Sequence, residues 1–135
     1  MGQDQVILID THIVVWLALN PKKLSRKACA AIDEARTNGE GLAVASISLF
    51  ELAIIATSGR IHLDISVESF LQEVEARFIV KPLTGRISVK AQALPEHYPN
   101  DPMDRIIGAT ALIEGLSLIT ADERIRKAKV VSTIW

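Results

Sequence analysis

The chain has 135 residues, a formal net charge of −1 and a pI of about 6.3. This length fits one domain, and no run of about 18 apolar residues is present that could cross a membrane. The near-neutral charge argues against the global basic field by which many proteins hold nucleic acid tightly and without sequence preference.

Strand and helix patterns alternate through the first half of the chain. Taken in order, they are an apolar strand at Val6–Ile9, helices at Thr11–Leu19 and Ser25–Asn38, a strand at Leu42–Ala45 and a helix at Ser48–Thr57. The strands are short, apolar throughout and rich in β-branched or small residues, which is typical of parallel strands buried on both faces.

The second half of the chain continues the same alternation. In order, it contains a helix at Ser66–Arg77, a strand at Phe78–Val80, a helix at Thr84–Leu94, a loop at Pro95–Asn100, a helix at Pro102–Glu114, a strand at Leu116–Ile119, a short helix at Asp122–Lys127 and a strand at Val130–Ile134. We therefore predict a single α/β domain over residues 1–135, a three-layer α/β/α sandwich around a parallel sheet of about five strands.

The N-terminus and the cysteine content bear on the compartment. Met1 to Gln5 contains no basic residue ahead of the first apolar run, so we expect no secretory signal peptide. Cys29 is the single cysteine and can form no internal disulfide, which favours a reducing compartment and hence the cytoplasm. The hydrophobic fraction of 49% is high for a small soluble domain, so we expect a partner to cover part of the apolar surface.

Four carboxylates lie close to the starts of predicted helices, and they are Asp10, Glu51, Asp104 and Asp122. Ligands of an open parallel sheet bind beyond the carboxyl ends of its strands. The connections from the preceding strands place Asp10, Glu51 and Asp122 at that edge. Asp104 is reached from a loop, but its helix must begin at the same edge if it runs back to feed a parallel strand.

Four acids at one edge predict a cation. Two carboxylates about 4 Å apart repel by about 4 kcal/mol at an effective dielectric constant near 20. Mg²⁺ and Mn²⁺ prefer oxygen ligands of this kind. The sequence thus points to a metal site and to phosphate chemistry.

Each acid also has a structural explanation. Ser48 and Glu51 have the spacing of a capping box, and Asp101 stands where an N-cap precedes a helix. Asp10 and Asp122 could cap the helices that follow them, because the helix dipole favours negative charge at that end. Taken singly, each residue fits a cap as well as a site, whereas the four together favour a site.

Four segments resemble one known family: ILIDTHIVVWL, VASISLFELAI, NDPMDRIIGATAL and SLITADERI. In this order and spacing they are similar to the PIN-domain ribonucleases, and within that family to the VapC toxins of prokaryotic toxin–antitoxin pairs. The resemblance covers nearly the whole chain.

The resemblance implies roles for particular residues. It identifies Asp10, Glu51, Asp104 and Asp122 as the acidic quartet that holds one or two Mg²⁺ or Mn²⁺ ions. Asp101 matches an extra acid of one subgroup and is either an accessory ligand or an N-cap.

Two further residues carry alternatives of their own. Thr120 matches a hydroxyl residue that supports the metal-bound water, or it satisfies backbone groups at the strand end. Arg105 is a candidate contact to an RNA phosphate, or it forms a surface ion pair with a nearby acid.

The same resemblance implies an activity and partners. The expected reaction is metal-dependent hydrolysis of RNA, in which an activated water leaves a 5′-phosphate and a 3′-hydroxyl. A cognate antitoxin is expected to bury an apolar groove and insert a basic side chain among the acids, and the chain is expected to form a homodimer.

Two other functions compete with this interpretation. One is a catalytically silent PIN fold that binds protein or RNA, against which an intact acidic quartet argues. The other is a Mg²⁺-binding receiver domain of the signalling type, which needs adjacent acids after the first strand and a lysine at a late strand end. Here Asp10 is followed by Thr11, and the late strand leads to Asp122 rather than to a lysine.

Overall fold

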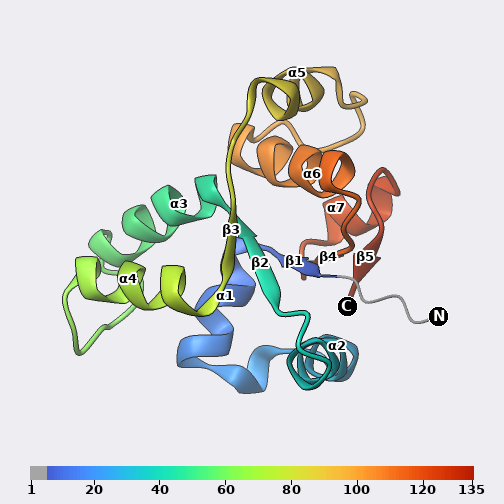
Figure 1. Ribbon diagram of the computed structural model, residues 1–135. Helices are drawn as coiled ribbons and strands as arrows, with labels where there is room; N and C mark the ends of the chain where they lie inside the picture. Colours follow the sequence, from blue (N-terminus) through green and yellow to red (C-terminus); the bar gives the residue numbers. More distant parts are fainter. Residues whose placement is uncertain (1–5) are drawn as a thin grey trace.

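Five short strands form one parallel sheet in residues 6–135, which are the residues that the computed structural model describes (Figure 1). The strands are β1 Ile7–Ile9, β2 Leu42–Ala45, β3 Ile79–Lys81, β4 Leu118–Ile119 and β5 Thr133–Ile134. Their order is β3-β2-β1-β4-β5, so β1 is central, and Leu8 is in register with Ala43 on one side and Leu118 on the other. The predicted parallel α/β architecture is confirmed, while the expectation about a signal peptide concerns residues 1–5 and lies outside the described residues.

Helices cover both faces of this sheet. They are α1 Thr11–Leu19, α2 Arg26–Thr37, α3 Ser46–Thr57, α4 Val67–Arg77, α5 Gly85–Ala93, α6 Pro102–Glu114 and α7 Glu123–Ala128, and a single 3₁₀ turn at Pro21–Lys23 follows α1. Because strand side chains alternate, Ile9 and Val44 pack with α1 to α4, whereas Leu8 and Ala43 pack with α6 and α7. Figure 1 shows α5 on the far side of α6 from the strands, where Ile87 and Ala91 pack on Ala109.

Local signals in the sequence fix most helix ends. The side chains of Ser25, Ser66 and Thr84 each accept a backbone N–H of the first turn of α2, α4 and α5. Gly115 ends α6 in the left-handed conformation at φ 70°, which glycine adopts without strain. No helix in residues 6–135 is long and apolar enough to span a membrane.

The start of α3 differs from the prediction, and the difference reaches the site. β2 runs straight into α3 at Ser46, and the N-cap position is Ala45, whose side chain makes no capping bond. The capping box predicted from Ser48 to Glu51 is therefore wrong: Ser48 lies inside the helix, fully buried, and its hydroxyl accepts from Thr11 at 2.9 Å. Glu51 consequently lies in the second turn of α3 rather than the first.

Candidate metal centre

The predicted acids meet at one pocket of about 360 Å³ at the carboxyl edge of the sheet. The residues that line it are Asp10, His12, Trp16, Glu51, Asp101, Asp104, Ala121, Asp122 and Arg124. The acids come from four places in the fold: the end of β1, the second turn of α3, the start of α6 and the segment after β4. The crossover connections between the parallel strands thus bring together carboxylates that are up to 112 residues apart in sequence, from Asp10 to Asp122.

Asp10 is the most constrained of these carboxylates. It follows β1 directly and is buried, with 7% of its surface exposed. Its Oδ1 accepts from the backbone N–H of Thr11 at 2.9 Å, and its Oδ2 accepts from the hydroxyl of Thr120 at 2.7 Å. Burial raises the pKa of the Asp10 carboxyl above its usual value, although both hydrogen bonds act in the opposite direction. Asp10 is held in one orientation before any ligand arrives.

Thr120 joins the ends of two neighbouring strands. Its hydroxyl is fully buried, donates to Asp10 and accepts from the backbone N–H of Asp122 at 3.1 Å. Thr120 therefore satisfies a backbone N–H group, which was one of the two roles expected for it. Its hydroxyl also orients the Asp10 carboxylate.

Asp104 and Glu51 are partly buried carboxylates that differ from Asp10 in having no fixed partner. Within residues 6–135 neither side chain takes part in a hydrogen bond or an ion pair. Burial, followed by repulsion from Asp10, Asp101, Asp122 and Glu51, raises the pKa of Asp104 to about 7. The pocket thus holds more negative charge than its own groups can balance at neutral pH.

Asp101 and Asp122 act as caps and also line the pocket. Oδ1 of Asp101 accepts from the backbone N–H groups of Met103 and Asp104, at 2.9 Å and 3.2 Å. Oδ1 of Asp122 does the same at the start of α7, while its Oδ2 lies 3.7 Å from Nη2 of Arg124. Capping uses one oxygen of each carboxylate, so a cap and a ligand are compatible roles here.

The chemistry of this donor set fits a hard divalent cation. The polar groups that face one another are mainly carboxylate oxygens, which Mg²⁺ and Mn²⁺ prefer. In the part of the chain that the structure describes, however, no three acidic, histidine or cysteine side chains already stand in a ligand arrangement. Among the described residues, the carboxylates of Asp104 and Glu51 have no hydrogen bond that would prevent them from turning toward an ion.

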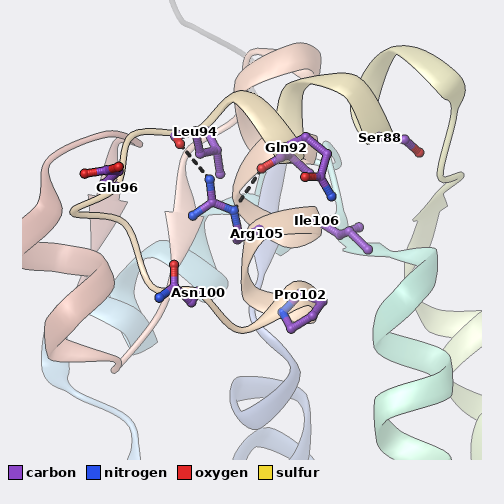
Figure 2. A pocket seen from close by; sticks show the side chains of 9 residues that line it. Ser88, Gln92, Leu94, Glu96, Asn100, Pro102, Arg105 and Ile106 are labelled. Atoms are coloured by element: carbon purple, nitrogen blue, oxygen red, sulfur yellow. Dashed lines mark hydrogen bonds between the residues drawn. The ribbon is translucent and has the colours of Figure 1, made fainter.

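Arg105 lies away from the acidic pocket, so the structure does not bring it together with the four acids. Its guanidinium donates to the carbonyl oxygen of Ala91 in the last turn of α5 and to that of Leu94, the C-cap of this helix; Figure 2 shows it turned toward Leu94. It lines a separate pocket of about 470 Å³ between α5 and α6, and within residues 6–135 it forms no surface ion pair, the other role that the sequence suggested. The physical reason is that successive helical residues point about 100° apart, so Arg105 faces α5 when Asp104 faces the acidic pocket.

Sequence reasoning missed the arginine that does line the acidic pocket. Arg124 lies in the first turn of α7, its side chain is 73% exposed, and it is the cationic neighbour of Asp122. Its position two residues after Asp122 was a usable signal, because a first-turn side chain of that helix points back toward the edge at which the helix begins.

Comparison with known proteins bears on these observations. The PIN domain family matches residues 7–131. Over 131 residues the chain is 42% identical to Ribonuclease VapC22 of Mycobacterium tuberculosis (strain ATCC 25618 / H37Rv), which covers 96% of this chain and 98% of that protein.

Solved structures share the fold at lower identity. A toxin–antitoxin complex from Klebsiella pneumoniae has a TM-score of 0.66 and 23% identity, covering 94% of this chain and 96% of that one. VapBC2 from Rickettsia felis, bound to a DNA fragment from its promoter, has a TM-score of 0.72 and 15% identity, covering 96% and 97% of the two chains.

Proposed function

The chain belongs to the PIN-domain family and to its VapC ribonucleases, and from this premise we propose that it is a toxin that hydrolyses RNA phosphodiester bonds with Mg²⁺ or Mn²⁺. The observation that carries the metal dependence is the convergence of Asp10, Glu51, Asp104 and Asp122 on one pocket, where burial, together with repulsion from the neighbouring acids, raises the pKa of Asp104 to about 7. A cation in this pocket would lower the repulsion between the acids, and it would also attract the negative charge of an RNA phosphate.

The proposed roles of the acids follow from how firmly hydrogen bonds hold each carboxylate in place. Asp10 is fixed by Thr11 and Thr120 and would define the position of one or two ions. Asp104 and Glu51 would turn inward to complete the ligand set, with Asp122 and Asp101 beside them. Bound there, a divalent ion lowers the pKa of water and stabilises negative charge on a phosphate oxygen.

Arg124 is the residue that we assign to the substrate phosphate in place of Arg105. Its exposed guanidinium lies at the rim of the acidic pocket, and an arginine offers paired donors to phosphate oxygens. Its ion pair with Asp122 is long, with 3.7 Å between Nη2 and Oδ2, so the guanidinium can exchange that partner for a phosphate.

The proposal is tested by replacing Asp104 with asparagine. Purified protein is incubated with total RNA in the presence of Mg²⁺, Mn²⁺ or a chelator, and the fragments are mapped at their ends. We expect discrete cleavage with metal and a loss of at least about 100-fold in Asp104→Asn, since a ligand and its charge are removed.

A matched control guards against a general effect of losing an acid. Asp33 is exposed on α2 and lies outside the acidic pocket, so Asp33→Asn should cleave as the unchanged chain does. Undiminished cleavage by Asp104→Asn would refute the site assignment. If folded protein free of antitoxin cleaves nothing with any metal, the chain is a silent PIN fold that binds RNA or protein.

We infer further that a cognate antitoxin is the partner of this chain. A groove of about 490 Å³ runs between α1 and α4, and apolar side chains that include Leu17, Leu63 and Phe70 line it. Leu19 and Ile65 at its margin are 44% and 50% exposed, which leaves apolar surface for a partner to cover. An amphipathic antitoxin helix fits a groove of this kind, and two related solved structures are of toxin–antitoxin assemblies.

A homodimer and a cytoplasmic location complete the proposal. Phe50 and Ile54 on α3 and Val89 on α5 are exposed apolar residues that a second copy of the chain would cover. An RNA substrate and a single thiol at Cys29 are both consistent with the cytoplasm.

A further inference from the structure

Among the helices and strands that carry the four acids, α6 alone is not led into by a strand. Asp10 follows β1 directly, Asp122 follows β4 after two residues, and β2 runs without a loop into the helix of Glu51. α6 is instead entered from residues 94–101, which connect it to α5. The sheet therefore does not fix the start of α6, and other contacts must set the position of Asp104.

The guanidinium of Arg105 supplies one set of such contacts. Its Nε donates to the carbonyl oxygen of Ala91 at 2.9 Å, and its Nη2 donates to that of Leu94 at 2.6 Å (Figure 2). Its Nη1 makes longer contacts to the carbonyl oxygens of Tyr98 and Pro99, at 3.4 Å and 3.3 Å. One side chain of α6 thus contacts four carbonyl groups, one in the last turn of α5 and three in the residues that follow it.

The carbonyl groups at the end of α5 need donors that α5 itself does not provide. α5 ends at Ala93 with Leu94 as its C-cap, and the next residue is Pro95, which has no N–H. The last carbonyl groups of a helix lack partners within the helix, and its dipole favours a positive charge at this end. Arg105 meets both requirements and ties α5 to the first turn of α6.

Tyr98 completes the connection in the opposite direction. It is 1% exposed, and its hydroxyl donates to the carbonyl oxygen of Asp104 at 3.0 Å. Gly108 makes room for it, because a Cβ atom at that position would lie 2.7 Å from Cζ of Tyr98. The side chain of Tyr98 in the loop thus binds the backbone of α6, while the side chain of Arg105 in α6 binds the backbone of the loop.

We propose that Arg105 and Tyr98 form a two-way lock that sets the position of Asp104 in the metal site, an inference that rests on the proposed function. Both are positioning residues. Neither lines the acidic pocket, and each acts through the backbone beside Asp104. The lock takes the place of the strand connection that the other three acids have.

The lock predicts weaker metal binding when its donors are removed. Arg105→Met keeps the apolar stem but leaves four carbonyl oxygens without the guanidinium, and we expect Mn²⁺ to bind about tenfold more weakly or worse. Tyr98→Phe removes only the hydroxyl, so a smaller loss is expected. Arg105→Lys should recover part of the affinity, since one ammonium reaches some of the carbonyl groups but not all of them.

Calorimetric titration of the metal-stripped protein with Mn²⁺ tests this directly, well below the melting temperature of every variant. The matched control is Arg86→Met, the same change at an exposed arginine of α5, which should bind Mn²⁺ as the unchanged chain does. Circular dichroism establishes that each variant is folded. A residue that only stabilised the fold would lower the melting temperature and leave the Mn²⁺ affinity of the folded protein unaltered.

The outcomes separate the lock from the function on which it rests. Weak binding by folded Arg105→Met with normal binding by Arg86→Met supports the lock. Equal Mn²⁺ affinity in Arg105→Met and the unchanged chain overturns the lock and leaves the metal site standing. Failure of the unchanged chain itself to bind Mn²⁺ overturns both. If Arg105→Met does not fold, Tyr98→Phe and Arg105→Lys decide, and normal affinity in both overturns the lock.

Discussion

Asp104 is the residue at which the opposing demands of folding and function meet. Its side chain is partly buried among like charges, and its pKa rises to about 7 as a result. In the unfolded chain the same carboxyl titrates near its ordinary value of 3.8. The folded protein therefore binds a proton between these two pH values that the unfolded chain has already released. In the absence of metal, stability falls as pH rises through this window, and the full cost is present above about pH 7.

Removing this charge should stabilise the metal-free protein at alkaline pH. In chelator at about pH 8, Asp104→Asn is expected to exceed the unchanged chain by about 1–2 kcal/mol in free energy of unfolding, allowing for solvent screening of this partly exposed group. At about pH 4 the difference should vanish, because the carboxyl is then neutral in the folded protein as well. Thermal unfolding at the two pH values measures it.

Added Mg²⁺ supplies the complementary measurement. Ligand binding to the folded state alone stabilises it by mass action, so Mg²⁺ should raise the melting temperature of the unchanged chain more than that of Asp104→Asn. Equal melting temperatures for the two proteins at about pH 8 in chelator would mean that the acidic pocket carries no electrostatic cost.

Individual residues also show where sequence reasoning succeeds. Asp10 and Asp122 could be placed at the site because each follows an apolar strand, and in a parallel sheet that connection fixes the edge. The roles of Arg105 and Tyr98 could not be found in this way. Arg105 binds carbonyl groups 6 to 14 residues away, and backbone acceptors leave no mark on the identity of the residues that carry them.

At the scale of elements, predictions held where an element carries its own signals. α1 and α6 begin and end at the predicted residues, since Asn20 and Pro21 stop the first and Asp101, Pro102 and Gly115 bound the second. α3 begins earlier than predicted because β2 leads straight into it and Ala45 gives no capping signal. The placement of Glu51 one turn further along α3 follows from tertiary structure that a local pattern does not contain.

The close approach of α6 to the loop before it can be tested at Gly108. Gly108→Ala introduces a Cβ atom that meets the ring of Tyr98, and we expect a loss of about 1–3 kcal/mol, only partly offset by the better helix propensity of alanine. Gly85→Ala is the matched control, because a Cβ atom at Gly85 meets nothing within 4 Å. Chemical denaturation measures both. Equal stability of the two variants would mean that Tyr98 moves aside without cost.

At the scale of the whole molecule, α1 connects the two surfaces that the proposed function uses. Trp16 of this helix lines the acidic pocket, while Val14, Leu17 and Ala18 line the groove beside α4. A partner in the groove therefore lies one helix away from the acids. Under the proposed function, one antitoxin segment would occupy the groove and continue to the acidic pocket.

Occupation of the groove is tested by placing a charge on its exposed rim. Ile65→Glu should reduce binding of the cognate antitoxin by about 10-fold or more while RNA cleavage by the free chain stays unchanged, because a buried carboxylate opposes an apolar contact. Leu83→Glu places the same charge at an exposed apolar residue outside the groove and should not affect antitoxin binding. Copurification with the antitoxin, together with a cleavage assay, gives both results. Unaltered antitoxin binding by Ile65→Glu would place the interface elsewhere.

The hydrogen bond from Thr120 to Asp10 joins residues 110 positions apart, and this separation matters during synthesis. Asp10 is synthesised 110 residues before its partner Thr120 and 112 residues before Asp122. At about 5–20 residues per second, the interval is roughly 6–20 s. Before Asp122 is added, the chain lacks the complete set of acids of the proposed site, so under the proposed function it could not yet attack the RNA of the ribosome that is making it. The order of translation would thus delay the proposed activity until β4 and Asp122 have been made.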